Sequence, residues 1–166
     1  MSGGSPGPFS PQGAAEEFAQ LHQIEFEADK LLETIGIGPF VNDEAEGHLS
    51  ESSLVLVVGE PPTGFVCLEL VDGIPHIWQL AVDPDYGRRG LGRALVEAAC
   101  DWARSKGFDA VTLTMYRDPP WNGPFYESIG FETLAILTPG LFAVRQHERT
   151  IGDDDFGPRV AMRRSL

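Results

Sequence analysis

The most informative stretch of this chain reads Trp78-Gln79-Leu80-Ala81-Val82-Asp83-Pro84-Asp85-Tyr86-Gly87-Arg88-Arg89-Gly90-Leu91-Gly92-Arg93. An apolar strand passes through a proline-containing turn into three closely spaced glycines. Apolar residues at helical spacing follow from Ala94 to Ala103, so a helix begins directly after the glycines. The first N–H groups of a helix are unpaired and carry a partial positive charge, and glycines let an anion approach them closely. The stretch therefore predicts a phosphate or pyrophosphate site on the backbone of residues 87–93.

Arginine side chains at positions 88, 89 and 93 would add cationic donors to this site. They stand out because the chain as a whole carries a formal net charge of −13. A glycine-rich turn with solvated arginines is the alternative interpretation. Two nucleotide-binding motifs are excluded by spacing, since the chain has no GxxxxGK[ST] and its glycines read GxxGxG rather than GxGxxG.

Hydrophobic periodicity on either side of this stretch predicts a mixed α/β domain. Helices are expected over residues 14–35, 94–103, 124–128 and 141–150, and residues 42–53 are expected to form a loop or a second brief helix. Strands are expected over residues 54–58, 64–71, 74–82, 110–116, 131–137 and 159–163. Asp72-Gly73 is a two-residue turn signal, so the strands on either side of it should form a hairpin.

The composition indicates the class of protein, its possible partners and its location. The 166 residues are 42% hydrophobic and 22% charged, which is ordinary for a globular protein. We expect one domain over residues 14–166. A Gly-, Ser- and Pro-rich arm over residues 1–13 precedes it and is expected to be flexible or partly pinned to the domain. The acidic balance argues against nucleic-acid and membrane-surface partners and favours cationic ones. Cys67 and Cys100 lie in apolar surroundings without metal-type spacing, as expected for core thiols of a reducing compartment. With no apolar run of membrane-spanning length and no leader, a cytoplasmic location is expected.

A second motif lies downstream, at Phe125-Tyr126-Glu127-Ser128-Ile129-Gly130-Phe131, preceded by Pro120-Trp121-Asn122-Gly123-Pro124. Together with the glycine run, it resembles the GCN5-related N-acetyltransferase (GNAT) superfamily, whose signatures are Q/R-x-x-G-x-G/A and FYEKLGF. The segment before Phe125 also resembles a bacterial subgroup that has PWNAPFY at this place and tends to end in RVAMRR-L, as residues 159–166 do here. Gly87 departs from the Q/R of the first signature, which removes one side-chain contact but leaves the backbone amides in place.

This resemblance implies a mostly antiparallel sheet of six to seven strands with helices on both faces, in which the fourth and fifth strands splay apart. It also implies acetyl-CoA as the co-substrate, with no metal. Pantetheine would pair with the backbone of Leu80, Ala81 and Val82, in the manner of an added strand. The pyrophosphate would lie on the amides of Gly87 and of Arg88 to Arg93, that is, Arg88, Arg89, Gly90, Leu91, Gly92 and Arg93. Asn122, Phe125 and Tyr126 would approach from the other side.

Two side chains are candidates for moving protons when an amine attacks the thioester. By resemblance, the Tyr126 phenol would donate to the departing thiolate, although a core-packed tyrosine is the alternative. His76 precedes the cofactor strand segment, and an imidazole with an ordinary pKa near 6.5 can serve as a general base at neutral pH. A structural strand histidine, with solvent as the proton acceptor, is the alternative for His76.

The resemblance implies that the first helix walls the acceptor pocket, and Glu25 and Asp29 are spaced i, i+4 on that helix. Two carboxylates on one face suit a cationic amine, although a solvated helix face has the same pattern. Trp78 and Gln79 would position the substrate. The expected activity is N-acetylation of a small-molecule primary amine in a ternary complex, by a monomer or homodimer. The alternatives are acetylation of a protein or peptide amine, and an acyl-CoA-binding module without catalysis.

Overall fold

The computed structural model describes residues 7–8, 15–34, 36–37, 53–59, 61–87 and 89–166. In these residues seven strands form one sheet in the order β1-β2-β3-β4-β5-β7-β6. Their bounds are β1 Gly7–Pro8, β2 Leu54–Val58, β3 Gly64–Val71, β4 Ile74–Val82, β5 Ala110–Tyr116, β6 Glu132–Thr133 and β7 Arg159–Ser165. All neighbouring strands are antiparallel except β4 and β5, which are parallel. The predicted mixed, mostly antiparallel sheet is confirmed.

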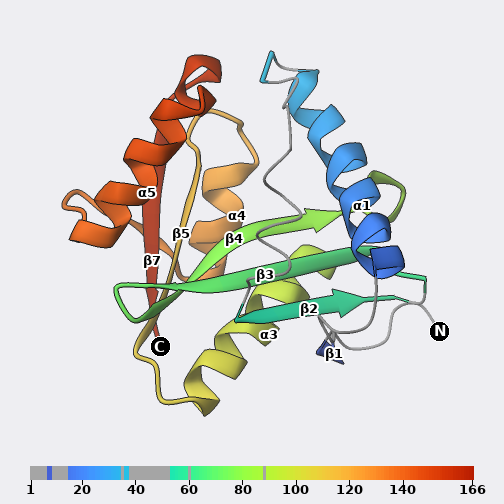
Figure 1. Ribbon diagram of the computed structural model, residues 1–166, viewed down its shortest axis with the longest axis horizontal. Helices are drawn as coiled ribbons and strands as arrows, with labels where there is room; N and C mark the ends of the chain where they lie inside the picture. The colour runs from blue at the N-terminus through green and yellow to red at the C-terminus, as the bar shows by residue number, and fades with distance from the viewer. Residues whose placement is uncertain (1–6, 9–14, 35, 38–52, 60, 88) are drawn as a thin grey trace.

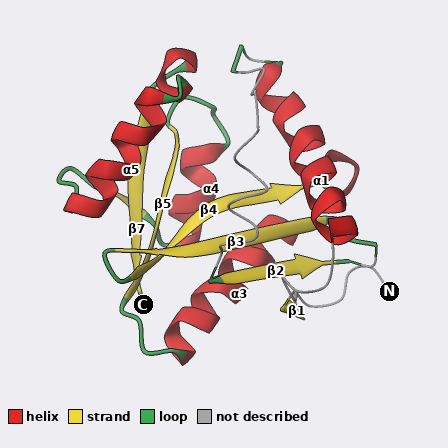
Figure 2. Ribbon diagram, in the orientation of Figure 1, coloured by secondary structure: helices red, strands yellow, loops and turns green. Residues whose placement is uncertain are grey.

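Helices cover both faces of this sheet (Figures 1 and 2). They are α1 Ala15–Glu33, α3 Leu91–Ser105, α4 Asn122–Ile129 and α5 Pro139–Thr150, with short 3₁₀ turns η2 Pro84–Tyr86 and η3 Asp153–Phe156. In Figure 1, α1 and α5 stand at opposite ends of the sheet, with β4 between them. No helix in the described ranges is both long enough and apolar enough to cross a membrane.

The two faces follow from the alternation of side chains along β3, because successive residues of a strand point to opposite sides. Phe65 and Cys67 join Leu21 and Ile24 of α1 in one buried cluster. The intervening Val66 and Leu68 join the cluster built around α3, whose buried members are Leu95, Val96, Ala99, Cys100 and Ala103. Both cysteines are buried and remain thiols, as the sequence predicts.

The splay between β4 and β5 is visible in their pairing. The two parallel strands pair at only two positions, His76 with Thr112 and Ile77 with Leu113. Beyond Ile77, residues 79–82 of β4 pair with β3 and not with β5. Val82 at the end of β4 and Tyr116 at the end of β5 both line a cavity instead. The sheet therefore opens where the glycine run begins.

Some expected elements differ from the structure in extent. The strand expected over 131–137 is reduced to Glu132–Thr133, since the chain leaves the sheet edge after Leu134 to start α5 at Pro139, and Ile136 is 86% exposed. The loop or helix expected over 42–53 falls almost entirely outside the described residues. Of the arm over residues 1–13, only Gly7–Pro8 is described, and it pairs with Leu56 and Val57 of β2.

The β3–β4 turn is joined to α5 by a long-range helix cap. Asp72 has a positive φ of 54°, and its carboxylate oxygens accept hydrogen bonds from the Gly140 N–H at 2.9 and 3.1 Å. A carboxylate at a helix N-terminus satisfies an unpaired N–H and favours the helix dipole. The contact therefore holds one end of α5 over the sheet.

Replacing Asp72 by Gly is expected to lower the free energy of unfolding by about 1 kcal/mol, because the cap is lost while glycine tolerates the positive φ. For a domain of this size that corresponds to a fall in Tm of roughly 2–4 °C. Asp72→Asn is the matched control, since asparagine keeps both an acceptor oxygen and tolerance of this φ, and it should retain most of the stability. Thermal unfolding followed by circular dichroism measures both variants. Equal Tm values for Asp72→Gly and the parent protein would show that the cap contributes nothing.

Candidate active site

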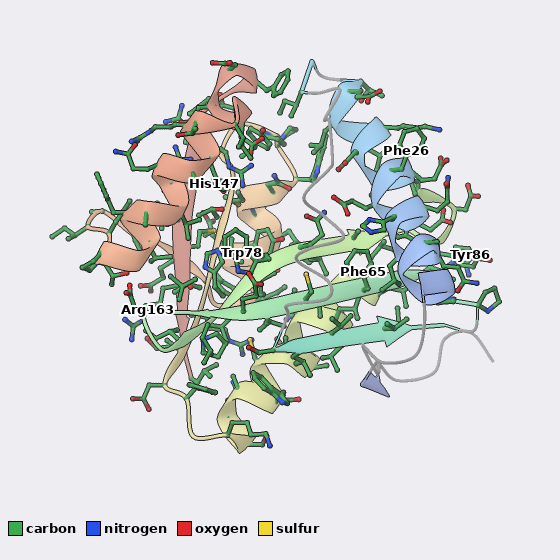
Figure 3. The ribbon with its side chains drawn as sticks, viewed as in Figure 1. Phe26, Phe65, Trp78, Tyr86, His147 and Arg163 are labelled. Atoms are coloured by element: carbon green, nitrogen blue, oxygen red, sulfur yellow. The ribbon has the colours of Figure 1, made fainter. Side chains whose placement is uncertain are left out.

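A cavity of about 1470 Å³ occupies the opening between β4 and β5 and extends across the sheet face between α1 and α5. Its lining comes from segments far apart in the sequence. They include α1, the second half of β4, the start of α3, the ends of β5 and α4, and the stretch from α5 into β7. Figure 3 shows Trp78 on the sheet between α1 and the helix that carries His147.

The glycine run forms one end of the cavity, at the N-terminus of α3. Gly90 caps the helix with φ 78°, in the left-handed region that glycine adopts at little cost. Gly87, Gly90, Leu91, Gly92 and Arg93 all line the cavity. The first N–H groups of a helix have no partner within it. The backbone here can therefore accept an anion, and the phosphate or pyrophosphate site on this run stays a prediction.

The three arginines near this end are placed differently. Arg93 lines the cavity, and its guanidinium lies 3.5 Å from both the hydroxyl and the carbonyl oxygen of Ser128 on α4. Arg89 instead stacks over the Tyr86 ring, with its guanidinium carbon 5.2 Å from the ring centroid. Arg88 lies outside the described residues. Among the described arginines, Arg93 is the one placed to add charge to the anion site.

The second half of β4 forms the floor of the cavity. Leu80, Ala81 and Val82 line it, as do Trp78 and Gln79. Register shifts at this point, because Cys67 pairs with Gln79 whereas Leu68 pairs with Ile77. Trp78 is thus the extra residue of a β-bulge, a feature that re-aims side chains and increases local twist. The bulge lies where β4 parts from β5.

α4 brings the second sequence motif to the opposite side of the same gap. Asn122, Phe125 and Tyr126 line the cavity. The Asn122 side-chain amide donates to the Tyr116 carbonyl oxygen at 3.1 Å, which ties the start of α4 to the end of β5. The Tyr126 ring packs edge-on against Phe125 and Phe131, with centroids 4.9 and 5.8 Å apart.

The Tyr126 hydroxyl is suited to donating a hydrogen bond. Burial raises the pKa of Tyr126 to about 12, with Arg159 opposing the shift. No residue in the described part of the chain makes a hydrogen bond to this hydroxyl. The phenol therefore remains protonated across the physiological pH range and can donate to a group that enters the cavity.

His76 lies next to residues that line the cavity but does not line it itself. The side chain is 1% exposed, and it is not among the described residues that line the cavity. Its Nδ1 lies 2.8 Å from Thr112 Oγ1, and its ring packs edge-on against Trp78 at 5.1 Å. Burial lowers the pKa of His76 to about 4, with Glu148 opposing and Arg159 reinforcing the shift. The imidazole is neutral at physiological pH and lies beneath Trp78.

α1 brings Glu25 and Asp29 to the cavity wall. Glu25 is 7% exposed, and burial followed by the charge of Asp29 raises the pKa of Glu25 to about 7. The i, i+4 spacing read from the sequence thus corresponds to two carboxylates on the cavity side of α1.

The wall opposite α1 carries an ionic network that the sequence analysis missed. Glu148 of α5 accepts hydrogen bonds from Thr114 of β5 at 2.6 Å, from Arg145 at 2.7 Å and from Arg159 of β7 at 3.0 Å. Burial alone would raise the pKa of Glu148, but Arg159, Thr114 and Arg145 hold it below its usual range. The i, i+3 spacing of Arg145 and Glu148 could have indicated an ion pair on one face of the helix. Thr114 and Arg159 approach Glu148 only because of the order of the strands in the sheet.

Taken together, the cavity has an anion-binding end at α3, a backbone edge along β4, a hydroxyl donor on α4 and an acidic end at α1. No group of three or more His, Cys, Asp or Glu side chains within the described ranges is arranged to hold a metal ion. Such a site can bind a long anionic molecule across the β4–β5 gap and an organic cation beside its far end.

Comparison with known proteins agrees with this arrangement. Residues 15–131 match the Acetyltransferase (GNAT) family. The chain is 29% identical over 112 residues to the [Ribosomal protein bS18]-alanine N-acetyltransferase of Salmonella typhimurium, a match that covers 68% of this chain and 74% of the relative. It is 34% identical over 96 residues to a mycothiol acetyltransferase of Beutenbergia cavernae, a match that covers 58% of this chain but 28% of that relative.

The fold likewise matches a solved structure that contains coenzyme A. The PaiA N-acetyltransferase from Thermoplasma acidophilum in complex with coenzyme A superimposes with a TM-score of 0.68 at 16% identity, covering 100% of both chains. The sequence match spans more than half of the chain and includes both the glycine run and all of α4. This chain therefore belongs to the acetyltransferase (GNAT) family and is an N-acetyltransferase.

Proposed function

We propose that this enzyme transfers the acetyl group of acetyl-CoA to the primary amine of a cationic small molecule, by direct attack of the amine on the thioester in a ternary complex. One observation carries the proposal. A single cavity joins the anion-binding start of α3 to the carboxylates of α1, so both reactants fit within one space. Holding them together replaces a collision in solution by attack at close range.

The cofactor is proposed to lie along the β4–β5 gap. Its pyrophosphate would rest on the amides of the run from Gly87 to Arg93, with Arg93 adding charge. Its pantetheine amides would pair with the backbone of Leu80 to Val82, which pairs with β3 but with no described strand on the side of the gap. Asn122 and Phe125 would contact it from α4.

Tyr126 is proposed to stabilise the departing thiolate of CoA. An alkyl thiol has a pKa of about 8.5, so a phenol with a pKa of about 12 does not transfer its proton outright to the thiolate. It instead donates a hydrogen bond that lowers the energy of the developing negative charge. The charge-assisted bond is strongest at the moment when the C–S bond breaks.

The acceptor is proposed to be an amine attached to an apolar body. Glu25 and Asp29 supply negative charge at α1, while Trp78 and Gln79 lie on the floor beside them. Leu31, Trp121 and Ile151 line the same cavity and are 50%, 46% and 48% exposed, which gives its mouth an apolar rim. Apolar contact surface beside buried carboxylates suits an amphipathic cation.

A protein or peptide amine is the second candidate, because the Salmonella relative is named for acetylating an alanine of a ribosomal protein. The expected cytoplasmic location and the oligomeric state stay predictions.

A screen of amines with the purified protein tests the proposal, using release of free CoA thiol from acetyl-CoA as the signal. The panel holds 2-phenylethylamine, 1,4-diaminobutane, glucosamine 6-phosphate and a peptide that begins with alanine. We expect 2-phenylethylamine and 1,4-diaminobutane, which carry no anionic group, to be acetylated with higher kcat/KM than the phosphorylated amine. Transfer to the peptide alone would favour the protein acceptor, and thiol release no faster than hydrolysis with every amine would contradict catalysis.

A further inference from the structure

We propose that Glu25 is the general base of the reaction, taking the proton from the acceptor ammonium group so that the free amine can attack the thioester. This rests on the proposed acetyl transfer. In this assignment Glu25, rather than His76 or a solvent molecule, accepts the proton directly from the ammonium group.

The placement of Glu25 is set by the packing of α1. Leu21 and Ile24 are buried against Phe65, Cys67 and Ala81 of the sheet, so α1 lies directly over the strand edge proposed to hold pantetheine. Ala28, one turn after Glu25, packs on the same cluster together with Trp78. Glu25 projects from this anchored part of the helix into the cavity wall while remaining 7% exposed. Figure 3 shows Trp78 and Phe65 of the sheet beside α1.

The charged and titratable groups around the cavity come from every element that borders it. On α1 itself, His22 Nδ1 lies 4.0 Å from a Glu25 carboxylate oxygen, and Asp29 is one turn away. Across the cavity lie Cys67 of β3, Tyr86 of η2, Arg93 of α3, Tyr116 of β5, Tyr126 of α4, His147 and Glu148 of α5, Asp153 and Asp155 of η3, and Arg159 of β7. The cations are engaged elsewhere, since Arg159 pairs with Glu148 and Arg93 lies beside Ser128. The acceptor end is therefore acidic.

Glu25 is better suited than His76 to act as the base, because its protonated form has the higher pKa. An alkyl ammonium has a pKa of about 10, so transfer to a group with a pKa of about 7 is unfavourable by a factor of about 10³. Transfer to His76, with a pKa of about 4, is unfavourable by a factor of about 10⁶. Glu25 is also ionised in a substantial fraction of molecules at neutral pH, and it lines the cavity.

The proposed step balances in protons and charge. The ionised Glu25 carboxylate takes one proton from R–NH₃⁺, and the nitrogen lone pair forms a bond to the thioester carbonyl carbon. Collapse of the tetrahedral intermediate breaks the C–S bond and expels the thiolate, which receives a hydrogen bond from Tyr126. The second ammonium proton passes from the nitrogen to the thiolate, giving the amide and CoA thiol. Glu25 then loses its proton to solvent.

The test compares pH profiles of kcat/KM for the parent enzyme and Glu25→Gln, with 2-phenylethylamine or whichever panel amine is acetylated fastest. The parent profile should have an acidic limb with an apparent pKa near 7, because kcat/KM reports ionisations of free enzyme and free substrate. In Glu25→Gln that limb should vanish, leaving a rise that follows the free amine toward pH 10. The loss should be about 10²-fold at pH 7 and at least tenfold smaller at pH 9.

Two further variants sharpen the test. Asp29→Asn removes the negative charge that helps raise the pKa of Glu25, so its acidic limb should move to lower pH. Glu27→Gln is the matched control, since Glu27 pairs with Lys30 on an exposed part of α1, and its profile should equal that of the parent. A Glu25→Gln enzyme with an unchanged limb and rate would overturn the inference, and so would one whose loss is the same at every pH.

A folding measurement that needs no acceptor provides a second readout. A carboxyl whose pKa is raised on folding stabilises the protein below its unfolded pKa, and that stabilisation is lost as the pH rises through about 7. Glu25→Gln should therefore raise Tm by several degrees at pH 8 and by little at pH 4. Equal effects at both pH values would contradict the titration assigned to Glu25. Absence of acetyl transfer by the parent enzyme would instead overturn the proposed function, so the two failures are distinguishable.

Discussion

A Gly92→Leu variant is expected to lose acetyl-CoA binding by at least about 100-fold. Gly92 lies in the first turn of α3 and lines the cavity, and a Cβ added there would point toward Phe125 with its Cζ 3.4 Å away. A leucine side chain would occupy the space through which the pyrophosphate approaches the backbone. Charge-assisted hydrogen bonds contribute about 1.5–3 kcal/mol each, so the loss of two accounts for at least a 100-fold change in Kd.

Gly92→Ala is the matched control for this experiment. Its single methyl group would make only ordinary contact with Phe125, and alanine is the better helix former by about 1 kcal/mol. It should therefore bind acetyl-CoA far more tightly than the leucine variant and unfold at no lower temperature than the parent. Calorimetric titration gives the Kd of each protein. Parent-like binding by Gly92→Leu would show that the cofactor does not contact this turn.

Tyr126→Phe is expected to lower kcat by at least about tenfold while leaving the Kd for acetyl-CoA nearly unchanged. The variant keeps the ring that packs against Phe125 and Phe131, and it removes only the hydroxyl. That hydroxyl is needed chiefly when the thiolate forms, so its removal raises the barrier rather than weakening binding. Groups that assist proton transfer usually contribute 10²–10⁴-fold, and water in place of the hydroxyl limits the loss.

Steady-state rates with a saturating amine, together with calorimetric titration of acetyl-CoA, measure the two effects separately. A Tyr126→Phe enzyme with the kcat of the parent would assign the tyrosine to packing. A rise in Kd with unchanged kcat would place its hydroxyl in cofactor binding instead.

Local patterns were sufficient to predict most of the fold. β2, β3, β4 and β5 have the predicted bounds, because each is a run of apolar residues delimited by turn residues such as Asp72-Gly73. The end of the cavity that we propose for the cofactor was also predictable, since its glycines, helix start and strand edge are contiguous in sequence. By contrast, the strand predicted over 131–137 was too long, because the chain must leave the sheet before α5, which begins at Pro139.

The acceptor end could be predicted only in part, because its residues meet through tertiary structure. Glu25 and Asp29 were identified from their spacing on one helix. The burial of His76 depends on its pairing with Thr112 and on the cover that Trp78 provides at the bulge, neither of which has a local signal. The network of Thr114, Glu148 and Arg159 assembles from three elements only once β7 lies beside β5.

The change in Tm on adding acetyl-CoA tests the central claim most directly, because it asks whether this cavity binds the cofactor before any acceptor is known. At an acetyl-CoA concentration of 100 times the Kd, binding to the folded state adds about 2.7 kcal/mol to the free energy of unfolding. For a chain of this size, the account predicts a rise in Tm of roughly 5–10 °C. An unchanged Tm at millimolar acetyl-CoA would contradict the assignment of the β4–β5 gap as an acetyl-CoA site.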